Sequence, residues 1–365
     1  MKKLGELANI YDGTHQTPTY TNKGVKFVSV ENINDIENTN KFITPEAFQK
    51  EYKIKPQKGD ILMTRITAGI IGATAIVKNN EPLGYYVSLA LIRIKVDLDI
   101  DFLAQRIETN QFKNQLHKRI IHVAFPKKIN LGDIQECTSY FPLPAEQEKI
   151  SFLIVLINER ITSSKKIIEK LESLMLGSCE KIFSQKFRFK DDLGNDFPDW
   201  EKSKLENICQ KQSSNISANK IENNFGNYIV YGASGVLKKV DFYEEENDYI
   251  SIVKDGAGVG RLFFCKGKSS VLGTMEIIKT KLDVNLQFLF YQLGNIDFKK
   301  YITGSTIPHI YFKDYKKENV KIPSLEEQNK IANFLSSIQE KILTEKQILE
   351  KLELQKKFLL ANLFV

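Results

Sequence analysis

Two glycine-rich segments are the first places in this sequence where phosphate chemistry could occur. Gly256-Ala257-Gly258-Val259-Gly260 resembles a dinucleotide-binding loop, but the residues after it predict a strand, whereas such a loop must open a helix. Gly267-Lys268-Ser269 resembles the end of a P-loop, but Leu262 stands where the first glycine of that motif belongs. We interpret the first segment as a hairpin turn and find no phosphate-binding loop in the second.

Residues suited to metal binding or nucleophilic catalysis are scattered. The cysteines Cys137, Cys179, Cys209 and Cys265 form no Cys-x-x-Cys pair and have no histidine at ligand spacing, which argues against a zinc site and a disulfide framework. The four histidines form no evident triad, and we find no Asn-Pro-Pro-Tyr type methyltransferase motif. We therefore expect a chain with no catalytic residues, no metal site and no cofactor of its own.

Polar side chains beside glycine-bearing loops are the remaining candidates, as nucleic-acid contacts. Arg and Lys recognise guanine, Asn and Gln recognise adenine, and nearby cations and hydroxyls hold phosphates. Loops carry recognition while strands hold them in place, so we prefer these positions, although each could equally be a solvated turn residue. The candidates in the first half are Thr14, His15, Gln16, Thr64, Arg65 and Thr67, with Lys127 and Lys128 for phosphate. Those in the second half are Tyr231, Ser234, Lys238, Lys239, Lys254, Arg261, His309 and Tyr311.

An internal repeat is the most informative feature of the chain. Residues 142–172 align without gaps with residues 323–353 at an offset of 181, and fourteen of the 31 positions are identical. Each copy follows a proline-containing extended segment, and acidic residues come next, which suits the positive end of a helix dipole. Both copies therefore predict one long helix.

Apolar residues in the two predicted helices recur at alternating steps of four and three. A spacing that averages 3.5 residues is typical of a coiled-coil seam. Ser164 and Glu345 occupy the same step of both seams, and a polar seam residue can fix register. We favour pairing of the helices with each other over packing of each helix on its own domain. The predicted seam comprises Ile150, Ile154, Ile157, Ile161, Ile168, Leu171, Ile331, Leu335, Ile338, Ile342, Leu349 and Leu352.

Segments of similar length, with short strand-like runs broken by glycine and asparagine, precede the two helices. We expect an α+β fold in which two globular domains alternate with two long helices that pair as an antiparallel coiled coil, with pseudo-twofold symmetry. Ile150 to Met175 spans 25 residues, or about 38 Å of helix, close to the roughly 34–36 Å turn of B-DNA. The predicted boundaries are 1–141, 142–178, 179–197 (a linker), 198–322 and 323–365.

The composition is that of a globular protein, with 42% apolar and 27% charged residues. The net charge of +7 is a mild excess and does not identify a partner by itself. The positively charged start has no apolar stretch behind it, and no apolar run approaches the length of a membrane span. We therefore expect a cytoplasmic protein without a membrane partner.

Several motifs make the chain resemble the specificity subunits of type I restriction–modification systems. The most specific are the doubled helix starts, Pro142-Leu143-Pro144-Ala145-Glu146-Gln147 and Pro323-Ser324-Leu325-Glu326-Glu327-Gln328. Gly59-Asp60-Ile61-Leu62, the tract from Phe187 to Trp200 and the run from Tyr228 to Gly235 add to them, so that the resemblance spans essentially the whole chain. One departure is that the Phe-Pro-Asp-Trp sequence at 197–200 has no counterpart before Leu4.

The resemblance implies that the two domains are target-recognition domains, each reading one half of a bipartite double-stranded DNA sequence. It implies that the helices set the gap between the halves and dock two modification (methyltransferase) subunits, and that restriction subunits complete the enzyme. S-adenosylmethionine, ATP and Mg are then expected in those partner subunits. The alternative is a coiled-coil adaptor that binds only proteins.

Two mutational hypotheses follow from these predictions. Arg65 and Arg261 each stand beside a glycine turn, so Arg65→Ala and Arg261→Ala are expected to weaken specific DNA binding and leave the fold intact. Removal of one heptad from a helix is expected to shorten the DNA spacer.

Overall fold

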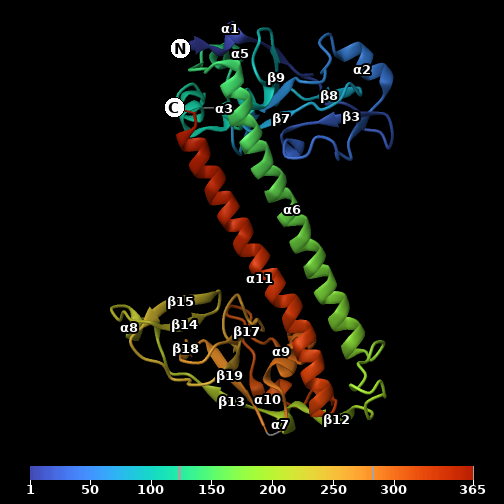
Figure 1. Ribbon diagram of the computed structural model, residues 1–365, viewed down its shortest axis with the longest axis vertical. Coiled ribbons are helices and arrows are strands. Elements are labelled where there is room, and N and C mark those ends of the chain that lie inside the picture. The colour runs from blue at the N-terminus through green and yellow to red at the C-terminus, as the bar shows by residue number, and fades with distance from the viewer. Residues whose placement is uncertain (122–124, 282, 365) are drawn as a thin grey trace. The chain divides into compact units, whose positions relative to one another are not determined.

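The computed structural model describes residues 1–121, 125–281 and 283–364. The chain divides into two compact units. Unit 1 comprises Met1–Lys165 and Gln347–Val365, and unit 2 comprises Lys166–Lys346. Each unit contains one domain of mixed helices and strands, together with part of both long helices, α6 (Pro144–Phe183) and α11 (Leu325–Asn362) (Figure 1).

Two sheets form the domain of unit 1. The larger is antiparallel in the order β2-β9-β5-β7, and the smaller has the order β4-β3-β8 with β3 and β8 parallel. The strands of the larger sheet are β2 (Ala8–Asp12), β9 (Leu89–Ile94), β5 (Ile61–Thr64) and β7 (Thr74–Ile76). Those of the smaller sheet are β4 (Phe42–Ile43), β3 (Val25–Val28) and β8 (Leu83–Tyr85).

Short helices and two-residue strands complete unit 1. The strands β1 (Lys2–Lys3) and β11 (Thr138–Ser139) pair with each other, as do β6 (Ile66–Thr67) and β10 (Lys127–Lys128). The helices are α1 (Leu4–Leu7), η1 (Val30–Asn32), α2 (Pro45–Glu51), α3 (Ile100–Glu108), α4 (Asn110–His117) and α5 (Leu131–Gln135).

Strand β5 lies between two apolar cores because its side chains alternate between the faces of the sheet. Ile61 and Met63 pack in one core with Leu103 of α3, and Leu62 packs in the other with Phe27 of β3. All three β5 side chains are fully buried. The alternation therefore fixes the orientation of β5, whose end carries the candidate contacts Thr64 and Arg65.

Unit 2 repeats this plan. Its antiparallel sheet has the order β13-β19-β16-β17, and its second sheet has the order β15-β14-β18, again with one parallel pair, β14 with β18. The strands are β12 (Glu201–Lys204), β13 (Cys209–Ser213), β14 (Tyr228–Gly232), β15 (Gly235–Val240), β16 (Tyr249–Val253), β17 (Leu262–Cys265), β18 (Ser269–Val271), β19 (Met275–Thr280) and β20 (Asn319–Ile322). The helices are α7 (Leu205–Ile208), α8 (Ala218–Ile221), α9 (Leu286–Gly294), η2 (Phe298–Tyr301) and α10 (Phe312–Tyr315).

Backbone hydrogen bonds show that the repeat extends through the domains. In unit 1, Ile129 N donates to Arg65 O at 3.0 Å. In unit 2, Ile310 N donates to Lys254 O at 2.9 Å. Arg65 N also donates to Ser88 O at 2.9 Å, and Lys254 N donates to Thr274 O at 3.0 Å. Arg65 and Lys254 thus occupy equivalent backbone positions.

A glycine with positive φ closes the turn after this position in both units. Gly72 has φ +89° and donates to Thr64 O at 3.0 Å. Gly260 has φ +85° and donates to Val253 O at 2.8 Å. Because a side chain is disfavoured in this left-handed region, glycine is required at both places. The glycine turns that the sequence predicts are therefore equivalent parts of one repeated frame.

The long helices contact each other in both units. In unit 1, Lys165 Nζ lies 3.2 Å from Glu353 Oε1, and Ile154 of α6 packs near Phe364. In unit 2, Lys346 Nζ lies 2.7 Å from Glu172 Oε1. Each of the twelve predicted seam residues is buried or half-buried.

The predicted boundaries of the first long helix differ from the structure. The helix begins at Pro144 and continues to Phe183, five residues beyond the predicted end at 178. The predicted linker, 179–197, therefore starts as helix, and its remaining part packs on unit 2. The second helix was expected at 323–365 and is observed at Leu325–Asn362, with residue 365 outside the described part of the chain. Prolines limit both starts, because Leu143 precedes Pro144 and Ile322 precedes Pro323, and the residue before a proline disfavours helical geometry.

Within the described residues, no helix is both long enough and apolar enough to cross a membrane. The same part of the chain contains no group of three or more His, Cys, Asp or Glu side chains arranged to hold a metal ion.

Candidate nucleic-acid interface

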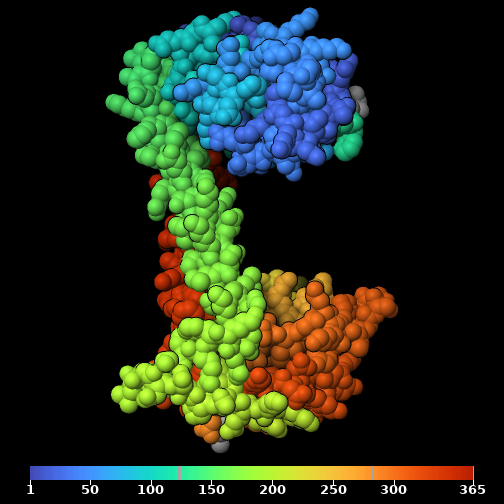
Figure 2. Space-filling model, turned by 90° about the vertical axis from the view of Figure 1, so that its right-hand side faces the viewer, coloured from blue at the N-terminus to red at the C-terminus, as the bar shows by residue number. Residues whose placement is uncertain are grey.

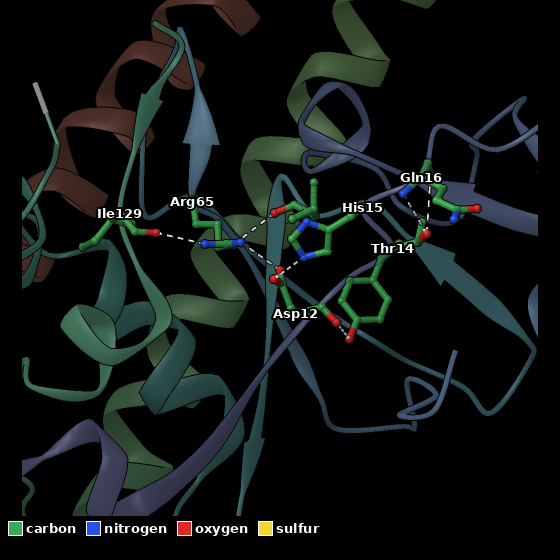
Figure 3. Close-up of polar contacts among 8 residues, drawn as sticks. Asp12, Thr14, His15, Gln16, Arg65 and Ile129 are labelled. Atoms are coloured by element: carbon green, nitrogen blue, oxygen red, sulfur yellow. Dashed lines mark hydrogen bonds and ion pairs between the residues drawn. The ribbon is translucent and has the colours of Figure 1, made fainter. Parts of the chain in front are cut away.

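Arg65, the strongest candidate reader in unit 1, lies at the centre of a hydrogen-bond network (Figure 3). Its Nη2 lies 2.9 Å from Asp12 Oδ1, its Nη1 donates to Ile129 O at 3.1 Å, and its Nε donates to Val87 O at 3.0 Å. The residue is 4% exposed. A guanidinium whose nitrogens are all engaged inside the domain holds β2, β5 and the loop before α5 together. The expectation that Arg65→Ala leaves the fold intact does not agree with this burial.

Asp12 connects this buried network to the surface. Its second oxygen, Oδ2, lies 2.7 Å from His15 Nε2, and the His15 side chain is 70% exposed. Tyr85 donates its hydroxyl to Asp12 O at 2.9 Å, and burial raises the pKa of Tyr85 well above its ordinary value, so the hydroxyl remains a donor. His15 is therefore held by the Asp12 carboxylate and presents its ring to solvent.

Two neighbouring candidates make mainly structural contacts. Thr14 is buried, and its hydroxyl donates to Glu51 Oε2 at 2.9 Å. Thr64 is 2% exposed, and its hydroxyl donates to Ile70 O at 2.7 Å. Gln16, in contrast, is exposed next to His15.

The remaining candidates in unit 1 lie together on one short ladder. Thr67 pairs with Lys127 and Ile66 pairs with Lys128, antiparallel, in β6 and β10. Thr67 Oγ1 accepts a hydrogen bond from Gly69 N at 2.9 Å. Lys127 is exposed and Lys128 half-exposed, so two cations lie beside the glycine turn, and their role as phosphate contacts stays a prediction.

Lys254 of unit 2 differs from its counterpart Arg65. The last residue of β2 is Asp12, which holds Arg65, whereas the last residue of β13 is the neutral Ser213. The Lys254 side chain is half-buried and makes no hydrogen bond or ion pair with any residue that the structure describes. The same backbone position therefore carries a cation bound to Asp12 in unit 1, and in unit 2 a cation with no ion pair among the described residues.

Arg261 corresponds to Ala73 and not to Arg65. Thr64 N donates to Ala73 O at 2.9 Å, and the equivalent donor in unit 2, Val253 N, bonds to Arg261 O at 2.9 Å. Both arginines stand beside the glycine turn, as the sequence indicates, but on opposite sides of it: Arg65 precedes the turn and Arg261 follows it.

Arg261 lies at the surface among other candidates. It is exposed, and its Nη1 donates to Ala233 O at 2.9 Å, next to the exposed Ser234. Tyr231 is half-buried in the adjoining strand, and burial raises its pKa, so it is a neutral hydroxyl donor. The structure thus brings Arg261 and Ser234 to one surface from segments 27 residues apart.

His309 comes from a third segment, which lies beside Lys254. It forms a β-bridge with Asp255, directly after Lys254, and its ring lies 5.0 Å from that of Tyr311. Lys238, however, donates to the backbone oxygens of Ile221 and Glu222 within unit 2 and is occupied there. Lys239 is exposed on the same strand, β15.

Known proteins share this sequence and fold. The sequence model of the family described as "Type I restriction modification DNA specificity domain" matches residues 198–354. The MjaIX specificity subunit of a type I restriction enzyme from Methanocaldococcus jannaschii is 23% identical over 389 residues, covering 96% of this chain and 88% of the relative. Residues 198–354 thus match the family of type I restriction–modification DNA specificity domains, and the chain as a whole is similar to a type I specificity subunit.

Shorter matches connect the chain to other specificity subunits. The putative type I specificity subunit S.MpnORF507P of Mycoplasma pneumoniae is 30% identical over 145 residues, 38% of this chain and 39% of the relative. S.MpnORF285P of the same organism is 28% identical over 169 residues, 43% of this chain and 54% of the relative. The match thus spans about half or less of the length of these two relatives.

The fold is that of solved type I specificity subunits. The structure of the specificity subunit of the type I system from M. genitalium superposes with a TM-score of 0.75 at 16% identity, covering 100% of this chain and 95% of the other. A chain from a study of complex assembly and conformational transition of the type I system superposes with a TM-score of 0.52 at 15% identity, covering 99% and 96%.

Sequence reasoning missed two kinds of residue at the candidate interface. Asp12, which anchors both Arg65 and His15, had no sequence signal beyond its place before a glycine. Ile70 and Phe125 are 67% and 91% exposed beside the Thr67 and Lys127 ladder. Ile70 and Phe125 could have been identified in the sequence as lone apolar residues inside a glycine- or proline-bearing loop.

Proposed function

We propose that this chain is the DNA-binding specificity subunit of a type I restriction–modification complex, and that the loops of each unit read one half of a bipartite duplex target. The observation that carries the proposal is the repeated frame around Arg65 and Lys254. Each copy of this frame gathers exposed basic side chains: Lys127 and His15 in unit 1, and Arg261 in unit 2. Such cations bind phosphate and base edges and release counterions.

The long helices are proposed to pair as an antiparallel coiled coil with pseudo-twofold symmetry. Lys165 pairs with Glu353 in unit 1, and Lys346 pairs with Glu172 in unit 2. Because Lys346 is Lys165 plus 181 and Glu353 is Glu172 plus 181, the two ion pairs exchange under the repeat. A twofold axis between antiparallel helices produces this exchange, which supports the proposal that the helices set the spacing of the two readers.

Two modification subunits are proposed to dock on the helices, and restriction subunits to complete the assembly. Large apolar side chains remain exposed along both helices, which supports protein contacts there. They include Phe152, Leu156, Leu174, Leu354 and Phe358. On this proposal the chain is the non-catalytic subunit, and S-adenosylmethionine, ATP and Mg belong to its partners in the cytoplasm.

The decisive experiment maps adenine methylation across the genome of a methylation-free host. The partner modification subunit is expressed alone, with this chain, or with its Lys254→Ala variant. We expect a split motif of two short half-sites only when the chain is present, and a weaker or altered half-site with Lys254→Ala. The proposal would be contradicted if an active modification subunit, in a verified complex with this chain, produced no methylated motif. That result would favour a protein-binding adaptor, and no salt-dependent binding to DNA would then be observed.

A further inference from the structure

A groove of about 380 Å³ opens on unit 1 between α3, the loop before β4 and the first turns of α6. Figure 2 shows the blue part of unit 1 beside the green helix α6, which forms one wall of the groove. The described residues that line the groove include four carboxylates, from Asp35, Glu37, Asp101 and Glu108, and one lysine, Lys78. The groove is therefore negatively charged, although the net charge of the chain is +7.

Three of the lining side chains form a stripe of hydrogen-bond acceptors along α3. Asp101, Gln105 and Glu108 are separated by four and three residues, and this spacing places them on one face of the helix. The two steps correspond to roughly 6 and 4.5 Å along the helix axis. A single small ion cannot contact acceptors spread over that length, so the stripe suits an extended ligand.

Two members of the stripe have acceptors that no described residue uses. Gln105 is 7% exposed, its Nε2 donates to Ser151 O at 3.1 Å, and its Oε1 is buried without a hydrogen-bond partner in the described chain. Asp101 is half-buried, and its side chain makes no hydrogen bond or ion pair with any residue that the structure describes. Burial, followed by the charge of Asp99, raises the pKa of Asp101. A bound cation that carries N–H donors would relieve both costs.

The other carboxylates of the groove are partly satisfied. Glu108 Oε1 accepts from Thr74 Oγ1 at 3.2 Å, and Glu108 Oε2 lies 3.9 Å from Lys356 Nζ. On the opposite wall, Glu37 Oε2 lies 3.5 Å from Lys78 Nζ. Because an ionised carboxylate has about four lone-pair sites, both groups can still accept from a ligand.

Helix α9 of unit 2 is the counterpart of α3. At the start of α3, Asp99 N donates to Gln147 Oε1 at 3.1 Å, and at the start of α9, Asn285 N donates to Gln328 Oε1 at 2.9 Å. Asp99 and Asn285 are also the N-caps of the two helices. Residue 99 therefore aligns with residue 285, and the two helices can be compared position by position.

Aromatic side chains cover the equivalent face of unit 2. Phe290, which stands in the place of Ala104, has its ring 5.8 Å from that of Phe264. Tyr291, which stands in the place of Gln105, donates its hydroxyl to Ser336 Oγ at 3.2 Å. The open, charged groove is thus a feature of unit 1 that the shared fold does not require. In unit 2 the stripe has no charge, because its three positions are Gln287, Tyr291 and Gly294.

We propose that this groove of unit 1 binds a linear polyamine, with spermidine as the best match to the stripe. The two segments of spermidine contain four and three methylenes and span roughly 6 and 5 Å when extended, on standard bond lengths. Its three ammonium groups would donate to Asp101, Gln105 Oε1 and Glu108, and its methylenes would lie on Ala104 and Val155, which also line the groove. The proposal does not depend on DNA binding.

The test is isothermal titration calorimetry of the full chain with spermidine at low ionic strength. We expect one saturable site that weakens about fivefold or more with Asp101→Asn, because a charge-assisted hydrogen bond is lost. Gln105→Met, which removes the unpartnered acceptor, should weaken binding by a similar factor. Butylammonium has a single ammonium group and should bind at least about tenfold more weakly than spermidine. Circular dichroism checks the fold of both variants, and Asp101→Asn decides the question if Gln105→Met does not fold.

Glu246→Gln is the matched control. Glu246 lines an acid-rich groove of unit 2, where the buried carboxylate of Glu245 already accepts from Gln212 Nε2 at 2.8 Å and lies 2.6 Å from Lys279 Nζ. This variant should leave spermidine binding unchanged. The absence of saturable binding, or equal affinity for the unchanged chain and for Asp101→Asn, would overturn the proposal. Equal affinity for spermidine and butylammonium would also overturn it, as would binding that only Glu246→Gln removes.

Discussion

Replacement of Glu327 by glutamine should destabilise unit 2 far more than the same change at its repeat counterpart, Glu146. Glu327 is fully buried and accepts three hydrogen bonds from Arg188 and Trp200, and its carboxylate raises the pKa of Arg188. Glutamine removes the negative charge and turns one acceptor into a donor facing other donors. Glu146 is exposed and makes no such contacts.

The size of the destabilisation depends on the hydrogen bonds that Arg188 retains in the Glu327→Gln variant. Removal of one partner of a buried ion pair costs roughly 3–5 kcal/mol. Arg188 would still donate to Phe197 O and Pro198 O, and its side chain is 24% exposed, so it is not left without partners. We therefore expect Glu327→Gln to lower the free energy of unfolding of unit 2 by about 2–3 kcal/mol. Glu146→Gln should change stability by less than about 0.5 kcal/mol.

Trp200 makes the assay specific, because it is the only tryptophan in the chain and lies in unit 2. Urea unfolding followed by its fluorescence reports on that unit. With a slope of about 1–3 kcal/mol per M urea, the midpoint should fall by roughly 1–2 M for Glu327→Gln. A midpoint for Glu327→Gln that equals that of Glu146→Gln would refute the argument that this carboxylate anchors residues 184–200.

Three further outcomes are expected. Arg65→Ala should destabilise unit 1 by about 2–4 kcal/mol because it leaves Asp12 and two carbonyls without their donor; limited proteolysis will detect this, and a loss no larger than that of His15→Ala would contradict the structural role. Lys254→Ala should keep its unfolding midpoint and lower the slope of log affinity for DNA against log salt by about 1, whereas an unchanged slope would exclude a phosphate contact. Deletion of the repeat-equivalent heptads 162–168 and 343–349 shortens both helices by about 10 Å, so methylation mapping should show a spacer about three base pairs shorter; an unchanged spacer would mean that the helices do not set the spacer length.

The sequence was sufficient to predict the two long helices and their register. Helix periodicity is a local property, and the similarity of residues 142–172 to 323–353, with fourteen of 31 positions identical, doubled the signal. The first helix was predicted to end at 178, whereas Cys179, Ile182 and Phe183 pack in a core of unit 2 and the helix continues to Phe183. Helix ends depend on such tertiary contacts more than on propensity.

The loops of the candidate site could be predicted from the sequence, but the contacts of individual residues could not. Glycine turns identified the loops, since a positive φ restricts the residue type. The backbone hydrogen bonds place Arg65 and Lys254 at equivalent positions. The sequence did not indicate that Arg65 is buried against Asp12 while Lys254 has no such carboxylate beside it.

By itself, the sequence determined that the chain is a doubled unit of domain and helix, because repeats and periodicity are written along the chain. The tertiary structure decided the burial and the contacts of residues that are identical or similar in the two halves. Arg65 is buried because Asp12, 53 residues away, lies beside it. Glu146 and Glu327 have the same place in the repeat, yet only Glu327 is buried, because residues 139 and 127 positions away cover it. Burial and charge pairing arise from such distant neighbours, and no local pattern encodes them.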